Sequence, residues 1–108
     1  MSVNARLRKK IRLRKKIHGT AEKPRLSIYK SLRSLYAQII DDDAGKTLAS
    51  AMTVRKKNQK AAAELGASLF QKAKEKNISR IVFDRNGYRY HGVVKTFADS
   101  LRSSGLQF

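Results

Sequence analysis

Cysteine is absent from this sequence, and its continuous apolar segments are short. Without thiols the chain can form no disulfide and can offer no thiolate as a nucleophile or metal ligand, which fits a reducing compartment. No apolar run approaches the roughly 20 residues that a membrane-spanning helix needs. The N-terminal cations are not followed by the apolar core of a secretory signal, and the segment lacks the serine content typical of a mitochondrial presequence. We therefore expect a cytoplasmic protein with no membrane partner.

Acidic residues are also scarce: eight Asp and Glu stand against 25 Lys and Arg, so the formal net charge is +17. This exceeds what solubility requires, since a magnitude of about 2–8 is enough for a small domain. Residues 1–25 carry +9, and the rest of the chain carries +8. Both parts are therefore basic, and a nucleic acid is the first partner to consider.

Residues 6–17 are the most basic segment, with eight Lys and Arg, four aliphatic residues and no acid. Repulsion among the cations makes such a segment poorly stable alone. Its aliphatic residues form two pairs, each four residues apart, so a helix would gather a small apolar surface. We expect a basic arm that is disordered when free and helical against a phosphate-rich partner. A membrane-surface helix is the alternative, but the bulky aromatic residues usual in such helices are missing here.

Residues 18–24 separate this arm from the rest of the chain. Pro24, the only proline, cannot continue a helix and favours an extended entry into the segment after it. Gly19 is interpreted as a flexible point in this hinge. The sequence therefore predicts a basic N-terminal arm and hinge over residues 1–24, then one domain over residues 25–108.

The domain shows two periodicities. Alternation of apolar and polar residues predicts three strands, and a short apolar stretch predicts a fourth, buried strand; these are residues 25–31, 35–40, 46–52 and 80–84. Helical spacing of apolar residues predicts helices at about 57–76 and 91–103. The fold class is therefore α/β (α+β) in the order β-β-β-α-β-α. A right-handed crossover would place the fourth strand parallel to the first, giving a mixed four-stranded sheet.

Two places in the domain combine cations with aromatic side chains. The loop over residues 85–92 joins a strand to a helix, a position that commonly carries ligands in open sheets. Arginine can bond phosphates in forks and tyrosine can stack on an unpaired base, although a tight turn with a packed tyrosine is equally compatible. Around the first hairpin, Tyr29 and Tyr36 are interpreted as half-exposed strand residues, and the neighbouring cations as phosphate contacts.

The candidate RNA-binding residues combine these cations and aromatic residues with those of the arm and hinge. They are Arg6, Arg8, Lys9, Lys10, Arg12, Arg14, Lys15, Lys16, His18, Lys23, Arg25, Lys30, Arg33, Arg85, Tyr88, Arg89, Tyr90 and His91.

No enzymatic site is expected. Asp41, Asp42 and Asp43 could suggest Mg²⁺, but consecutive aspartates at a strand end do not converge, and a solvated turn is the better interpretation. His18 and His91 have no thiol, zinc-ligand spacing or nucleophile pattern around them. Neither a Walker loop nor a dinucleotide fingerprint is present. We therefore expect no catalytic residue, no metal and no cofactor.

Several short segments, in order along the chain, match one known family. They are Pro24-Arg25-Leu26-Ser27, Leu35-Tyr36-Ala37-Gln38-Ile39-Ile40-Asp41-Asp42, Gly45-Lys46-Thr47-Leu48-Ala49-Ser50-Ala51, Ile81-Val82-Phe83-Asp84-Arg85, Gly87-Tyr88-Arg89-Tyr90-His91-Gly92 and Gly105-Leu106-Gln107-Phe108. Together they resemble large-subunit ribosomal protein eighteen of the bacterial type, a family that binds 5S ribosomal RNA.

The resemblance implies a ribonuclease H-like fold of the translational-machinery kind. It also implies a structural role in the central protuberance of the large subunit, where the family joins 5S rRNA to 23S rRNA beside ribosomal protein five, with no homo-oligomer expected. Ribonuclease H-like enzymes hold carboxylates on the first strand, and residues 25–31 have none, so the nuclease site is not shared. The rival interpretations are a non-specific nucleic-acid-binding protein, a metal-dependent nuclease using Asp42, and a membrane-active arm.

Overall fold

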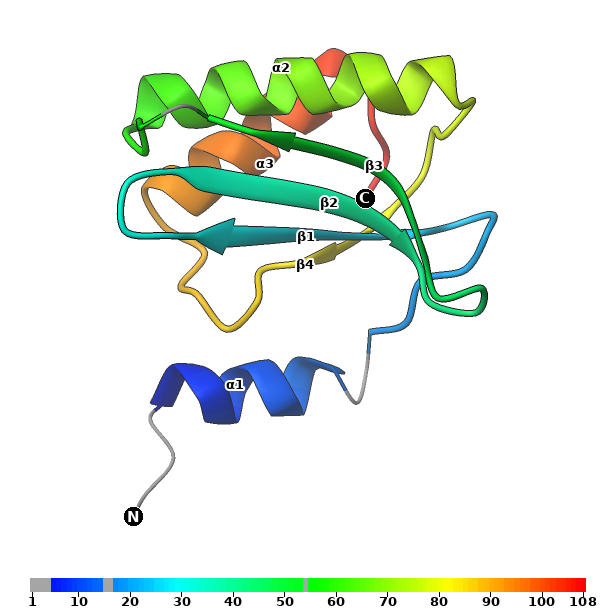
Figure 1. The fold of residues 1–108 in the computed structure, drawn as a ribbon, viewed down its shortest axis with the longest axis horizontal. Helices are drawn as coiled ribbons and strands as arrows, with labels where there is room; N and C mark the ends of the chain where they lie inside the picture. Colours follow the sequence, from blue (N-terminus) through cyan, green and yellow to red (C-terminus); the bar gives the residue numbers. More distant parts are fainter. Residues whose placement is uncertain (1–4, 15–16, 54) are drawn as a thin grey trace.

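The computed structural model describes residues 5–14, 17–53 and 55–108, without the side chains at positions 6, 10 and 13 (Figure 1). Its elements in chain order are α1 (Ala5–Arg14), β1 (Arg25–Lys30), β2 (Leu35–Asp41), β3 (Lys46–Met52), α2 (Gln59–Glu75), β4 (Val82–Asp84) and α3 (Val93–Ser104). From residue 25 onward, the predicted order β-β-β-α-β-α is confirmed.

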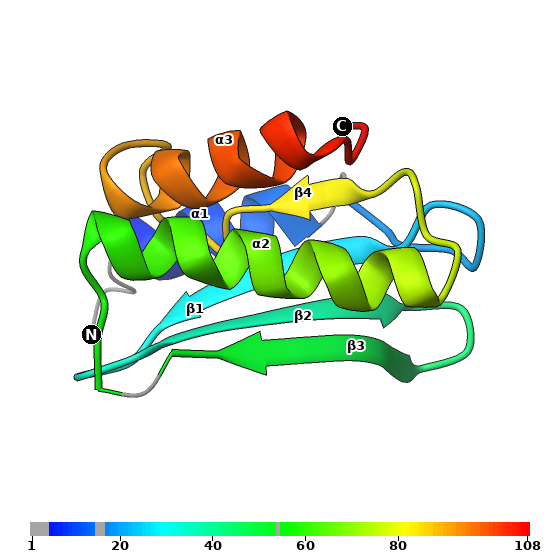
Figure 2. The same ribbon diagram turned by 90° about the horizontal axis from the view of Figure 1, so that it is seen from above.

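The four strands form one mixed sheet in the order β3-β2-β1-β4. β2 is antiparallel to both of its neighbours, while β4 is parallel to β1, as predicted. Helices α2 and α3 cover one face of this sheet, and α1 lies on the other side (Figures 1 and 2). The sheet therefore has one face packed against helices and one open face.

The core lies between the sheet and the two covering helices. Inward-facing residues of β1 and β2 meet the apolar stripes of α2 and α3, and each large aliphatic or aromatic side chain buried here stabilises the fold by about 1.5–3 kcal/mol. The fully buried large residues include Leu26, Ile28, Leu35, Ile39, Leu69, Phe97 and Leu101. Gly66 lets α2 approach α3 closely, because a Cβ there would lie 2.7 Å from the Ser100 hydroxyl oxygen.

The ends of both covering helices reflect local chemistry. Asn58 caps α2, and its side-chain oxygen accepts the Ala61 N–H at 2.8 Å. Asn77, just after α2, has a positive φ of 60° that stops the helix, and Gly105 ends α3 with a φ of 120°. α3 begins at Val93 rather than at residue 91, since Gly92 has a positive φ of 57°.

The fourth strand is shorter than the predicted range 80–84. The N–H of Ile81 donates to the Gln107 carbonyl at 3.1 Å, and the Gln107 N–H donates to the Ser79 carbonyl at 3.0 Å. The C-terminal segment therefore pairs with residues 79–81, and β4 joins β1 only from Val82 onward.

Gly19 serves close packing rather than flexibility, which corrects its interpretation from the sequence. Its backbone is buried, and its N–H donates to Asp42 Oδ2 at 2.7 Å while its carbonyl accepts the Asp42 N–H at 3.0 Å. A Cβ at this position would lie 2.3 Å from the Arg25 nitrogen and 2.6 Å from the Ile40 carbonyl oxygen. The hinge is thus fixed against the start of β1 and the end of β2.

Candidate nucleic-acid interface

Three connections of the domain meet at one end of the molecule. They are the β1–β2 turn, the β3–α2 connection and the β4–α3 loop, which lie together at the left in Figure 1. We call this region the basic end and define it by the cations Lys30, Arg33, Arg55, Lys56, Lys57, Arg85 and Arg89. Residues 25–40, 44–63 and 85–92, which supply these connections, contain no acid. A phosphate backbone would meet no repulsive carboxylate from these segments.

Hydrogen bonds hold the first two connections together. Thr53 is 9% exposed; its hydroxyl accepts the Leu35 N–H at 2.9 Å and donates to the Lys56 carbonyl. The Arg55 N–H donates to the Ser34 hydroxyl at 3.2 Å, and the Lys57 ammonium donates to the Ser31 carbonyl at 3.3 Å. The backbone here is fixed, while the side chains of Arg33, Arg55 and Lys56 are exposed.

Tyr88 joins the third connection to the first. Its hydroxyl accepts the Lys30 N–H at 3.0 Å, and the Lys30 ammonium lies 4.9 Å from the centre of its ring. Arg85 Nη1 donates to the Tyr88 carbonyl at 3.2 Å, and the buried Asn86, with a φ of 55°, donates its N–H to Asp84. The loop is therefore a tight turn in which Tyr88 is partly packed on the core, the alternative left open from the sequence.

Tyr90 and His91 are placed differently within the same loop. The Tyr90 ring contacts Phe83 edge-on at 6.4 Å between ring centres, and its hydroxyl accepts a hydrogen bond from Arg102 at 2.8 Å. Tyr90 thus packs toward α3 and is still 38% exposed, and His91 and Arg89 are exposed as well. Of the predicted residues in this loop, Arg89 is an exposed cation and is open to a phosphate.

Two helices also start at the basic end. α2 and α3 both begin there, and neither has an acidic residue in its first turn. The aligned peptide dipoles place partial positive charge at each of these termini. The field of the backbone therefore adds to that of the side chains.

Helix α1 borders this end. One end of α1 meets the β4–α3 loop in a shallow hollow of about 260 Å³, lined by Ala5, Lys9, Gly87, Tyr88 and Arg89. At the other end, Arg14 donates to the Ile17 carbonyl at 2.6 Å and lies 3.7 Å from Asp42. Arg8 and Arg12 are exposed on α1. The side chains of Arg6 and Lys10, and all of Lys15 and Lys16, lie outside the described residues.

Arg25 was predicted to contact phosphate, but its guanidinium is bound to two aspartates of the fold. Its guanidinium donates to Asp42 from Nε at 3.0 Å and from Nη2 at 3.1 Å, and to Asp84 from Nη1 at 2.9 Å. The Arg25 and Asp42 side chains are only 12% and 11% exposed, and that of Asp84 is 1% exposed. Its donors already face carboxylates, so Arg25 acts inside the fold.

These contacts lower the pKa of Asp42 to about 2. The main cause is the hydrogen bond from Arg25; the Gly19 N–H and the charges of Arg25 and Arg14 act in the same direction, against the opposing effect of burial. The sequence predicted a solvated aspartate turn, and for Asp42 this prediction is wrong. Asp41 is 7% exposed and accepts two N–H groups of the turn, while the exposed Asp43 pairs with His18 at 2.6 Å.

Metal binding finds no support in the described part of the chain. Within it, no three His, Asp or Glu side chains lie close enough to hold an ion together. No helix within the described ranges is both long and apolar enough to cross a membrane.

Nine of the predicted contact residues fall into two groups at opposite ends of the molecule. The basic end brings together Lys30, Arg33, Arg85, Tyr88 and Arg89, while Arg14, His18, Lys23 and Arg25 lie toward the opposite end, beside the aspartate turn or the start of β1. Sequence reasoning missed Arg55, Lys56 and Lys57. The sequence could have predicted their position, because these three neighbouring cations follow β3. In an antiparallel sheet the end of β3 lies beside the start of β2, next to the first hairpin turn.

Comparison with known proteins places these features in context. The model of the family described as "Ribosomal L18 of archaea, bacteria, mitoch. and chloroplast" matches residues 2–108. The large ribosomal subunit protein uL18 of Geobacter metallireducens is 54% identical over 112 residues, covering 96% of this chain and 93% of the relative. The uL18 proteins of Petrotoga mobilis and Pelobacter propionicus are 49% and 50% identical, each covering 95% of this chain and 92% of the relative.

Proposed function

The chain belongs to the ribosomal L18 family, and we propose that it binds 5S rRNA and helps to attach it to 23S rRNA in the central protuberance. The family makes it a structural, non-enzymatic protein of the large subunit in the cytoplasmic ribosome. Ribosomal protein five is the proposed neighbour on the same RNA. A ribonuclease H-like relationship of the fold is part of this proposal.

The observation that carries the proposal is the acid-free basic end beside a basic helix. Exposed cations from three connections of the domain surround one surface, and α1 brings Lys9 next to Arg89. Lys and Arg side chains on such a surface neutralise crowded phosphates and release their counterions. Ion pairs within the fold occupy Arg25, whereas no ion pair in the described part of the chain involves the cations of the basic end.

Recognition on this surface depends on the shape of the RNA. The major groove of an A-form duplex is too deep and narrow for side chains to read bases, so phosphate positions and unpaired regions carry the specificity. A folded RNA that presents phosphates to the arm and to the basic end together would bind more tightly than a duplex that reaches only one of them. This distinguishes a specific 5S rRNA partner from general coating of nucleic acid.

Filter binding tests the proposal directly. The chain is titrated with 5S rRNA and with a shuffled RNA of equal length at about 0.15 M salt, where the Debye length is near 8 Å. We expect clear preference for 5S rRNA. Equal affinities would instead support a non-specific nucleic-acid-binding protein.

Reconstitution provides a second measurement. Large-subunit particles assembled without the chain should lose 5S rRNA, and adding the chain back should restore it. Particles that retain 5S rRNA in the absence of the chain would contradict the attachment role.

A further inference from the structure

The open face of the sheet carries a row of large exposed side chains. Tyr29 of β1 faces Tyr36 of β2 in register, and Tyr36 faces Met52 of β3. These side chains are 48%, 38% and 51% exposed, and the two tyrosine rings lie 6.2 Å apart at 43°. Helices α2 and α3 pack on the other face; α1 lies on this side of the sheet, but none of its described residues lines the hollows beside the row.

A polar row runs beside the tyrosines. Ser27, Gln38 and Ser50 occupy the next outward positions of the three strands, in register with one another. A hollow of about 410 Å³ joins the two rows and is lined by Ser27, Tyr29, Ser31, Tyr36 and Gln38. The open face thus combines flat apolar surface with hydroxyl and amide groups in hydrogen-bonding reach of an occupant.

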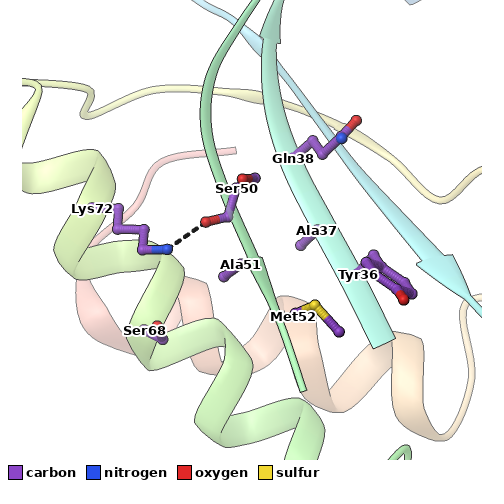
Figure 3. Close-up of a pocket in the computed structure, with 8 residues that line it drawn as sticks. All are labelled: Tyr36, Ala37, Gln38, Ser50, Ala51, Met52, Ser68 and Lys72. Atoms are coloured by element: carbon purple, nitrogen blue, oxygen red, sulfur yellow. Dashed lines mark hydrogen bonds between the residues drawn. The ribbon is translucent and has the colours of Figure 1, made fainter. Parts of the chain in front are cut away.

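A second hollow extends this surface to the sheet edge. It has a volume of about 500 Å³ and includes Tyr36, Gln38 and Met52 (Figure 3). Tyr36 and Gln38 project from β2 away from α2, while Lys72 reaches from α2 to the Ser50 carbonyl at 2.5 Å. The Lys72 ammonium thus donates a hydrogen bond to a backbone carbonyl of the edge strand β3. This disfavours the pairing of a further strand at that edge.

The charges around the tyrosine row select the kind of occupant. β1 and β2 with their turn (residues 25–41) contain one acid, the buried Asp41 at the far end of β2, and residues 44–63 contain none. Lys30 and Arg33 adjoin the tyrosine end of this face, and Lys57 is hydrogen-bonded to the turn between β1 and β2. An occupant that is polyanionic and also has flat apolar groups fits both features, and unpaired nucleotides have this chemistry.

We propose that Tyr29 and Tyr36 form a stacking platform for unpaired bases of the bound RNA. Bases stack on the exposed rings, Ser27 and Gln38 bond their edges, and the adjoining phosphates lie toward Lys30 and Arg33. This deepens the proposed function and rests on RNA binding by the chain. A base-paired region offers no free base face to the rings, so the platform selects single-stranded loops or bulges.

Alanine and phenylalanine variants separate stacking from folding. The double variant Tyr29→Ala/Tyr36→Ala should lose about 5- to 150-fold in affinity for 5S rRNA for each stacked base. The slope of log affinity against log salt should stay unchanged, because no phosphate contact is removed. Tyr29→Phe/Tyr36→Phe keeps the rings and should bind within a few-fold of the parent. Urea unfolding of both variants verifies that the fold is intact.

A tryptophan reporter tests the contact itself. The chain has no tryptophan, so Tyr36→Trp creates a single reporter on the open face. Its fluorescence should be quenched by a single-stranded oligoribonucleotide, and much less by the same strand annealed to its complement. This readout needs no preference for 5S rRNA, so stacking can be confirmed even if the filter-binding test of the proposed function fails.

A folded Tyr29→Ala/Tyr36→Ala variant that binds 5S rRNA as tightly as the parent would overturn the platform. If that variant also failed to enter large-subunit particles, the open face would be assigned to a protein neighbour. Either way, 5S rRNA binding by α1 and the basic end would still stand.

Discussion

Arg25 and Asp42 form a two-point ion pair, with Nε donating to Oδ2 at 3.0 Å and Nη2 to Oδ1 at 3.1 Å. Arg25 begins β1, and Asp42 stands just after β2. The Gly19 N–H also donates to Asp42, and Arg14 lies 3.7 Å from it. One carboxylate therefore connects the end of α1, the segment between α1 and β1, and the sheet.

Replacing Asp42 by asparagine should destabilise the protein by about 1–3 kcal/mol at pH 6. Removing one partner of a fully buried pair costs about 3–5 kcal/mol, but this pair keeps slight exposure and asparagine retains one acceptor oxygen. Urea unfolding measures the difference. Asp99→Asn is the matched control, because Asp99 is 52% exposed and pairs with Lys95 on the surface of α3, so its loss should cost at most about 0.5 kcal/mol.

The same pair predicts a pH dependence. Folding lowers the pKa of Asp42 from 3.8 to about 2, so the unfolded chain binds more protons between these values. The contribution of Asp42 is complete above about pH 4 to 5 and is lost as the pH falls toward 2. The difference in stability between parent and Asp42→Asn should therefore shrink over that window. A difference that stays constant from pH 6 to pH 2.5 would contradict the lowered pKa.

Gly19→Ala should also destabilise the fold, by about 1–3 kcal/mol, since the added methyl group overlaps backbone atoms that cannot move freely. Ala21→Gly is a suitable control: Ala21 is exposed in the same hinge, and this change adds chain flexibility without a clash. Urea unfolding would distinguish the two. If Gly19 were only a flexible point, alanine there would leave stability unchanged or raise it slightly.

The sequence predicted the domain well because its periodicities are local. Alternating apolar residues located β1 to β3, and helical spacing located α2 and α3, so connection rules were enough to predict the mixed sheet. The extent of β4 was missed because the competing partner of residues 79–81 is the C-terminal segment, which is distant in sequence. Such long-range pairing leaves no periodic signal.

The site was predicted less completely, for a related reason. A cation's role depends on which carboxylate lies beside it, and Arg25 meets Asp84 only because β4 pairs with β1. By contrast, the exposed position of Lys30 and Arg33 could be predicted, because a hairpin turn exposes its own residues. Arg55 and Lys57 are hydrogen-bonded to Ser34 and Ser31 in the first hairpin turn, which is distant in sequence. The spacing of residues therefore could not predict this cluster; only the order of strands in the sheet could.

Tyr88→Phe should cost about 0.5–1.5 kcal/mol, the usual net value of one hydrogen bond, because the Lys30 N–H loses the hydroxyl acceptor. Tyr90→Phe is the control: its hydroxyl bonds the exposed side chain of Arg102, which water can replace, so its cost should be smaller. Thermal or urea unfolding measures both. Equal effects would mean that Tyr88 does not tie the β4–α3 loop to β1.

The missed cations give the sharpest test of the interface. In the variant Arg55→Gln/Lys56→Gln/Lys57→Gln, three exposed charges of the basic end are removed. If each contacts a phosphate, the magnitude of the log–log salt slope for 5S rRNA binding should fall by about 0.7–0.9 per residue. For the parent, about eight phosphate contacts correspond to a slope of roughly −6 to −7.

A charge-matched control separates local contact from net charge. Lys46, Lys74 and Lys76 are also exposed but lie at the opposite end of the molecule, at the start of β3 and the end of α2. Replacing these three by glutamine lowers the net charge by the same amount. If these cations acted only through long-range attraction, both triple variants would bind 5S rRNA more weakly by similar amounts. If Arg55, Lys56 and Lys57 contact phosphates, only the first variant should show a smaller salt slope. Equal salt slopes in the two triple variants would therefore show that Arg55, Lys56 and Lys57 do not contact the RNA.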